Sequence, residues 1–121
     1  MDRNSTAITA YYELLAGGTT SFDPVRLRPL LADDLVFEGP IAGRVVGADR
    51  FVHGVTGFVE TMRGMTMLHR LTGDEEAATM YDAELPAGTV RFAEFFRLTA
   101  GRITGLRLLY DAERYRAAGG R

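Results

Sequence analysis

One acidic residue lies among apolar neighbours in the C-terminal half of the chain. The segment 89–99 alternates in the manner of a strand, and one of its faces carries Val90, Phe92, Glu94, Phe96 and Leu98. Burying an unpaired charge is costly, so a carboxyl group on this face has to be hydrogen-bonded, paired or protonated. Desolvation raises the pKa of a carboxyl group, which makes it a proton donor near neutral pH. We therefore predict Glu94 as a catalytic acid.

The register of the next predicted strand, 102–110, leaves two environments open for Glu94. If Ala100-Gly101 forms a simple two-residue turn, Glu94 lies opposite Arg107 and forms an ordinary ion pair. A shift of one residue places Leu108 opposite Glu94 and turns Leu108 and Tyr110 toward the same interior.

Two tyrosines share the apolar stripe of the predicted first helix. Tyr11 and Tyr12 fall on the face that Ile8 and Leu15 also occupy. A buried tyrosine hydroxyl usually finds a hydrogen-bond partner, and one of these two could donate to a ligand oxygen beside Glu94. The alternative is plain packing.

Two further residues are predicted as proton carriers, Glu38 and His69. Glu38 follows Phe37 in a short predicted strand, and the two side chains point to opposite faces unless a bulge intervenes. His69 alternates with Met67 on one strand face and could move protons near neutral pH. The alternative for His69 is a core or interface residue.

Other side chains on the inward faces are predicted to bind a ligand. They are Tyr12, Phe37, Phe58, Met67, Tyr81, Phe92, Leu108 and Tyr110. No metal site is expected, because the two histidines are isolated and the chain has no cysteine. No cofactor is expected either, since no glycine-rich phosphate loop is present.

These residues need an α+β scaffold, a curved antiparallel or mixed sheet around about three N-terminal helices. Helices are expected at about 6–16, from Asp23-Pro24 and at 48–62, with either a kink or a restart at Pro29. Strands are expected at 35–38, 44–46, 65–72, 76–85, 89–99 and 102–110. Short helices cannot fill a curved sheet completely, so a pocket is expected. The chain is predicted to be one domain, 1–121, ordered over about 6–115 and frayed beyond Tyr115.

Composition narrows the possible partners. The net charge is −2 and the 14 basic residues are scattered, which argues against nucleic-acid binding. No apolar run is long enough for a membrane span and the start does not resemble a secretory signal, so a cytoplasmic location is expected. The outer sheet face, with Met80, Asp82, Glu84 and Phe95, is predicted to form a homodimer.

Three phrases resemble the nuclear transport factor 2-like superfamily, in particular its SnoaL-like and ketosteroid-isomerase-like members. They are LADDLVFEGP, GADRFVHGVTGFVETM and FAEFFRLTAGRITGLRLLYD, and the resemblance extends from Thr6 to Asp111. It implies the cystatin-like, cone-shaped fold. It does not fix activity, because members include isomerases, cyclases, dehydratases, epoxide hydrolases and non-catalytic modules.

Comparison with the isomerases finds counterparts in this chain for some of their catalytic residues. The resemblance places the oxyanion tyrosine at Tyr11 and the protonated acid at Glu94. The isomerase base, an acid before a proline, falls on Gly39, so ketosteroid isomerase activity is not expected. Two hypotheses remain: a cofactor-independent acid/base enzyme acting on a small, largely apolar molecule, and a non-catalytic ligand-binding or dimerisation module.

Overall fold

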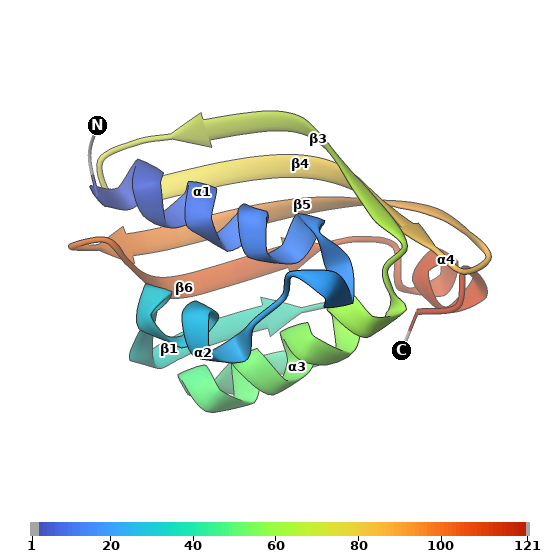
Figure 1. Cartoon of the computed structure of the whole chain (residues 1–121), viewed down its shortest axis with the longest axis horizontal. Coiled ribbons are helices and arrows are strands. Elements are labelled where there is room, and N and C mark those ends of the chain that lie inside the picture. Colours follow the sequence, from blue (N-terminus) through green and yellow to red (C-terminus); the bar gives the residue numbers. More distant parts are fainter. Residues whose placement is uncertain (1–2, 121) are drawn as a thin grey trace.

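The protein is described by a computed structural model covering residues 3–120, in which helices cover one face of a curved sheet (Figure 1). The helices are α1 (Arg3–Ala16), α2 (Pro24–Leu27), α3 (Ala48–Thr61) and α4 (Ala112–Ala117), with single 3-10 turns η1 (Gly18–Thr20) and η2 (Arg28–Leu30). The strands are β1 (Leu31–Gly39), β2 (Gly43–Val46), β3 (Gly64–Thr72), β4 (Glu76–Leu85), β5 (Gly88–Thr99) and β6 (Arg102–Leu109).

The six strands form one mixed sheet in the order β2-β1-β6-β5-β4-β3. Strands β3 to β6 form an antiparallel meander, as their short connections predict. The β1–β2 hairpin joins this meander through a parallel pairing of β1 with β6. The predicted α+β class with a curved mixed sheet is confirmed.

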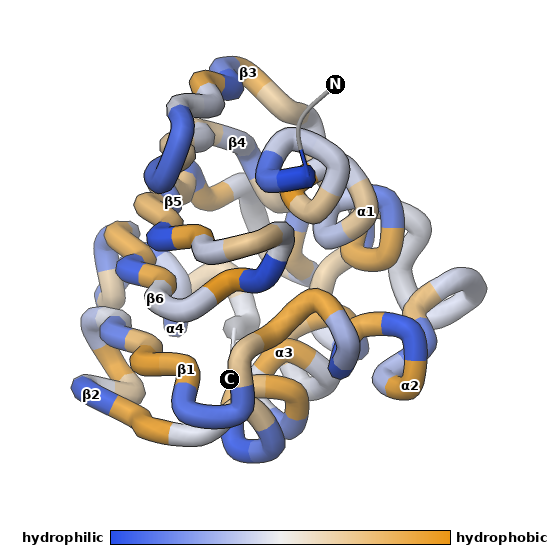
Figure 2. Tube along the Cα trace, turned by 90° about the vertical axis from the view of Figure 1, so that its left-hand side faces the viewer, coloured by the Kyte–Doolittle hydropathy of each residue, from blue (hydrophilic) through white to orange (hydrophobic). Residues whose placement is uncertain are grey.

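Two-residue alternation makes β4 and β5 the centre of the core. On β5, Val90, Phe92, Glu94, Phe96 and Leu98 are all buried, while the residues between them are exposed or half-buried. Figure 2 shows the sheet curling around an interior that is rich in hydrophobic segments, with α1 and α3 on its open side. The concave face of the sheet is therefore the apolar face.

The β5–β6 hairpin keeps the predicted two-residue turn but not the simple register. Ala100 and Gly101 both have positive φ, 51° and 79°, which is the twist a tight hairpin requires. The register shifts between the pairs Arg97–Gly105 and Leu98–Ile103, so one extra residue, Thr104, is accommodated.

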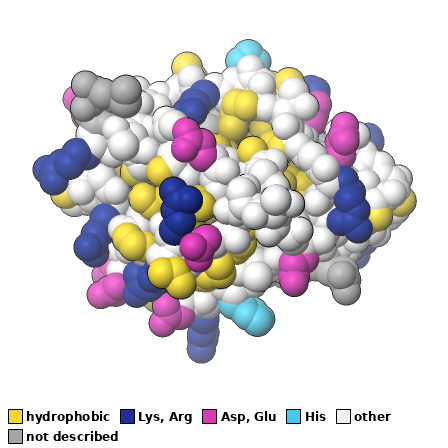
Figure 3. All heavy atoms as spheres, viewed as in Figure 1, with side chains coloured by type: hydrophobic (Ala, Val, Ile, Leu, Met, Phe, Trp, Pro, Cys, Tyr) yellow, Lys and Arg dark blue, Asp and Glu magenta, His cyan; other side chains and the backbone are white. Residues whose placement is uncertain are grey.

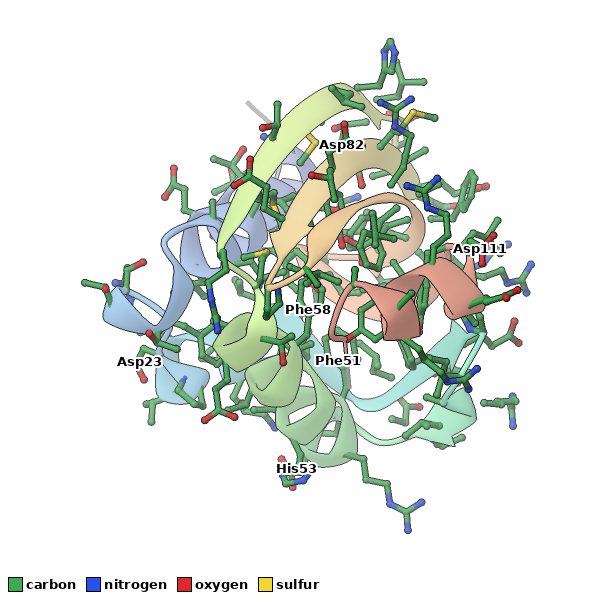
Figure 4. All side chains as sticks on the ribbon, turned by 90° about the vertical axis from the view of Figure 1, so that its right-hand side faces the viewer. Asp23, Phe51, His53, Phe58, Asp82 and Asp111 are labelled. Atoms are coloured by element: carbon green, nitrogen blue, oxygen red, sulfur yellow. The ribbon has the colours of Figure 1, made fainter. Side chains whose placement is uncertain are left out.

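Helix α3 lies along the concave side. Its buried residues include Phe51, Val55 and Val59, which repeat at helical spacing. Figure 4 shows Phe51 and Phe58 directed toward the sheet and His53 directed away from it, so His53 is a surface residue.

The segment around Pro29 and the C-terminal segment each differ in detail from, or decide between, the predicted alternatives. Asp23 caps α2 by accepting from the Val25 backbone N–H at 2.9 Å, and Pro29 lies in the first turn of the separate η2, which selects the restart over the kink. At the C-terminus the structure has α4, which extends two residues past Tyr115 into the segment where fraying was expected. Tyr115 and Ala118 are buried there, and Asp111 caps the helix at the Arg114 N–H.

Candidate functional site

A cavity of about 220 Å³ lies between α1, α3 and the concave face of the sheet. Its lining is mostly aromatic and aliphatic, and it opens near the β1–β2 turn, where Ile41 and Ala42 contribute. Eight of the predicted site residues line it: Tyr11, Phe37, Phe58, Tyr81, Phe92, Glu94, Leu108 and Tyr110.

Glu94 is a buried acid in the wall of this cavity. The residue is 2% exposed, and its strand partners are Thr79 on one side and Leu108 on the other. Arg107 lies opposite Phe95 instead, because of the register shift at Thr104. Of the two environments that the sequence left open, the structure has the one without an arginine beside Glu94.

Burial sets the acidity of Glu94. Desolvation raises the pKa of its carboxyl group from 4.5 to about 7, although hydrogen bonds from Tyr12 and Tyr81 act to lower it. At neutral pH the carboxyl group therefore exists in both protonation states, which is the condition under which one group can donate and accept protons.

Tyr12 supports the carboxyl group from outside the cavity. Its hydroxyl donates a 2.6 Å hydrogen bond to Oε1 of Glu94, and it lies 2.5 Å from Oγ1 of Thr79, which is also buried. Since the hydroxyl hydrogen of Tyr12 is directed at Glu94, Thr79 is the donor in the second contact. Tyr12, predicted as a ligand contact, is not among the residues that line the cavity.

Two more buried tyrosines near Glu94, Tyr11 and Tyr81, line the cavity itself. Tyr81 lies near Glu94 and, like Tyr12, acts to lower the pKa of its carboxyl group. Tyr11 packs edge-on against Tyr12, with ring centroids 5.1 Å apart. Burial and the nearby Glu94 charge raise the pKa of Tyr11 well above its usual value, so its hydroxyl remains a hydrogen-bond donor.

Aromatic rings form the rest of the wall. The Phe92 ring stacks on Tyr81 at 5.3 Å and contacts Phe58 at 5.5 Å and Tyr110 at 4.9 Å. Tyr110 in turn contacts Tyr115 at 4.9 Å. These rings offer broad apolar faces, which suit a flat, largely apolar guest.

Glu38 lies on the other face of the sheet, away from the cavity. Its Oε2 forms a 3.0 Å ion pair with Nε of Arg107, and the side chains are 42% and 66% exposed. Strand alternation turns Phe37 inward and Glu38 outward, with no bulge between them, so the structure does not bring Glu38 together with Glu94.

His69 is also displaced from the site. A bulge in β3 pairs Met67 with Tyr81 but His69 with Met80, whose neighbours on β4 are the inward residues. His69 is therefore exposed on the outer face, and the structure does not bring it together with Glu94. Met67 remains half-buried against the core but does not line the cavity.

A side chain at position 39 of β1 would be in tight contact with the Phe37 ring. A Cβ atom built on Gly39 would lie 3.0 Å from the Phe37 ring. The Phe37 ring therefore lies next to the position where the resemblance to the isomerases led us to look for a base. Among residues 3–120, no three metal-binding side chains lie together.

Sequence reasoning missed three informative residues. Tyr115 reaches the cavity from α4, and the Asp111 cap was the available signal for that helix. Thr79 was read only as a strand residue, although it is buried beside Tyr12. Arg50 lines the cavity from the first turn of α3, and no sequence pattern marks it.

The comparisons with known proteins agree with this geometry. The sequence profile of the SnoaL-like domain matches residues 8–106. The chain belongs to the SnoaL-like family. This SnoaL-like protein has no similar sequence among curated proteins.

Solved structures resemble the SnoaL-like chain over nearly its full length. A protein from Kribbella flavida DSM 17836 has a TM-score of 0.82 at 29% identity, with 93% of this chain and 90% of that chain covered. A steroid delta-isomerase from Pseudomonas aeruginosa has a TM-score of 0.82 at 16% identity, covering 98% and 88%. An NTF2-like protein from Burkholderia pseudomallei K96243 has a TM-score of 0.75 at 18% identity, covering 99% and 100%. The last two likenesses establish a shared fold.

Proposed function

We propose that this SnoaL-like protein binds a small, largely apolar carbonyl compound with its oxygen atom at the Tyr11 hydroxyl and the neighbouring carbon at Glu94, and that Glu94 exchanges a proton with that carbon without a cofactor. The observation that carries the proposal is a buried carboxyl group with a pKa of about 7 in the wall of an apolar cavity. The hydrogen bond from Tyr12 preorganises that group.

A single carboxyl group favours reactions that take and return one proton. The Glu94 carboxylate removes a proton from the carbon beside a carbonyl group, and the C–H electron pair forms the double bond of an enolate. The Tyr11 hydroxyl donates a hydrogen bond to the enolate oxygen, and protonated Glu94 returns the proton to carbon. Isomerisation or ring closure fits this sequence better than dehydration or epoxide opening. Those two reactions require a second group to activate or carry water, and no second carboxyl group lines the cavity within residues 3–120.

The alternative is a non-catalytic binding module. It is favoured by the outward positions of Glu38 and His69, which leave Glu94 without a separate proton partner in the cavity. The two functions share the same pocket and differ only in whether Glu94 moves a proton.

Hydrogen–deuterium exchange separates these functions. The probe is 2-tetralone, a two-ring ketone, and mass spectrometry follows deuterium uptake from D₂O at the carbon beside the carbonyl group. We expect acceleration by the wild-type protein and a loss of roughly 10²–10⁴-fold in Glu94→Gln. Glu38→Gln, which removes an acid on the other face, is the matched control and should retain the rate. Tetralone that binds without faster exchange would support the binding module.

We also propose a homodimer formed through the outer sheet face. Phe95 and Leu109 are large hydrophobic residues there, 48% and 53% exposed, and the Glu38–Arg107 pair lies beside them. A two-fold axis through such a patch would bury the apolar pair and place each carboxylate near a guanidinium group of the other copy.

In the described part of the chain, no helix is long and apolar enough to cross a membrane. On the face seen in Figure 3, acidic and basic side chains are interspersed without a basic stripe.

A further inference from the structure

We infer that the pocket takes a one- or two-ring carboxylic acid, held with its ring system against the aromatic wall and its carboxylate beside Arg50 at the rim. The inference rests on the proposed function, because it uses the same cavity and deepens the substrate class. Three observations support it: the size of the cavity, the shape of its wall and the position of its one cationic side chain.

Cavity volume limits the size of the guest. The cavity holds about 220 Å³. An apolar cavity of about 150 Å³ accepts benzene, and pockets for drug-sized ligands begin at about 300 Å³. A guest of one or two rings lies between these limits, whereas a four-ring guest exceeds them.

The wall selects a flat guest. Phe92 and Tyr81 stack nearly parallel, with an angle of 11° between their planes, while Phe58 and Tyr110 meet Phe92 at steeper angles. All four residues line the cavity, so a planar ring can lie against one aromatic face and meet the edges of others.

Arg50 gives the rim a positive charge that nothing else in the structure requires. It is the one cationic residue among those lining the cavity within residues 3–120, and it forms no ion pair there. Its neighbour Asp49 pairs with Arg28 instead, at 2.9 Å. A cation in the first turn also opposes the helix dipole of α3, so Arg50 does not serve the stability of that helix.

The distribution of charge orients the guest. Arg50 is exposed at the rim, and Glu94 is buried in the wall. The carboxylate of a guest is attracted to the guanidinium group of Arg50. Placing that charge beside Glu94, in an apolar environment, would cost free energy. The guest therefore enters with its ring system first, and one arginine matches one carboxylate.

A matched pair of ligands tests this assignment. Calorimetry at pH 6 and low salt measures the Kd of 2-naphthoate and of its neutral analogue 2-naphthamide. We expect wild-type protein to prefer the naphthoate by about fivefold, the range of an exposed ion pair, with the preference falling as salt is added. In Arg50→Gln the preference should vanish while the Kd of naphthamide is unchanged.

Two controls distinguish the causes of failure. Arg44→Gln removes an exposed arginine of β2 that does not line the cavity, and it should retain the preference. Androstenedione, a neutral four-ring ketone, should bind more weakly than naphthamide. Four results would each overturn the inference. The two naphthyl ligands could bind equally, or neither could bind. The preference for naphthoate could survive Arg50→Gln, or androstenedione could bind more tightly than naphthamide. Proton exchange that is insensitive to Glu94→Gln, with the naphthoate preference intact, would remove the proposed catalysis and leave this inference standing.

Discussion

The hydroxyl of Tyr12 donates a 2.6 Å hydrogen bond to Oε1 of Glu94 while Tyr12 itself stays outside the cavity. The bond therefore orients the carboxyl group and favours its charged form, and it leaves the cavity side of the wall to Tyr11 and Tyr81. The neighbouring tyrosines of α1 thus have separate roles. Tyr12 is a positioning residue, and Tyr11 is the one that can meet a ligand.

Removing the Tyr12 hydroxyl should make Glu94 a weaker acid. Because that hydroxyl stabilises the carboxylate, Tyr12→Phe should raise the pKa of Glu94 above its value of about 7, by roughly one unit or more. Carbon-detected NMR of side-chain carboxyl groups measures the titration directly. Tyr11→Phe is the matched control, since Tyr11 forms no hydrogen bond to Glu94 within residues 3–120. An equal shift in both variants would contradict the assigned roles.

Protein stability should fall as pH rises from about 4.5 to about 7. Glu94 is ionised above about 4.5 in the unfolded chain but keeps its proton up to about 7 in the folded chain. The unfolded state therefore binds fewer protons in this window, and the free energy of unfolding decreases by about 3 kcal/mol at most before levelling. Urea denaturation at several pH values should show this slope in the wild type and a flatter profile in Glu94→Gln. A slope that survives in Glu94→Gln would assign the effect to other groups.

The rate of tetralone exchange should follow the ionisation of Glu94. Proton removal needs the carboxylate, so the rate constant should rise about tenfold per pH unit below about 7 and level above it. In Tyr12→Phe the midpoint should move to higher pH together with the NMR titration. Rates that level at the ordinary pKa of an exposed glutamate would exclude Glu94 as the base.

Charge on the outer sheet face should dissociate the proposed dimer. Phe95→Glu places a carboxylate in the centre of the apolar patch, beside Leu109. Light scattering after size exclusion should then report half the wild-type mass. The matched control is Val25→Glu, which charges a residue that is 78% exposed on α2, away from the sheet. A wild-type protein that is monomeric at micromolar concentration would rule out this interface.

Truncating Tyr115 should weaken both the fold and the pocket. Its ring contacts Tyr110 and Phe92, and it lines the cavity from α4. Tyr115→Ala should lower the free energy of unfolding by roughly 3 kcal/mol, as for other large-to-small core substitutions. Thermal denaturation and naphthamide binding measure the two effects. Arg116→Ala, an exposed neighbour on the same helix, should leave both nearly unchanged.

The sequence was sufficient to predict helices and strands whose pattern of apolar residues lies within the element itself. Strand alternation around Glu94 identified the buried face of β5, and helical spacing at Phe51 and Val55 identified the buried face of α3. The pairing of β1 with β6 could not be predicted in the same way, because a parallel contact between segments far apart in the chain leaves no local pattern in the sequence.

Two bulges decide side-chain directions that alternation alone could not predict. One extra residue in β3 reverses the direction of His69, and another at Thr104 places Leu108 opposite Glu94. Alternation predicts side-chain direction only while the ladder is regular, and the β3 bulge has no glycine that would mark it. The contact between Tyr12 and Thr79 depends on how α1 packs across the sheet, which residue types alone do not determine.

The ring of Phe37, 3.0 Å from where a side chain at Gly39 would begin, also constrains how this protein can diverge. A side chain introduced at position 39 would press on that ring, which would have to shift by a few tenths of an ångström. We therefore expect substitutions at positions 37 and 39 to depend on each other, with a smaller residue at position 37 making an acid at position 39 easier to accept.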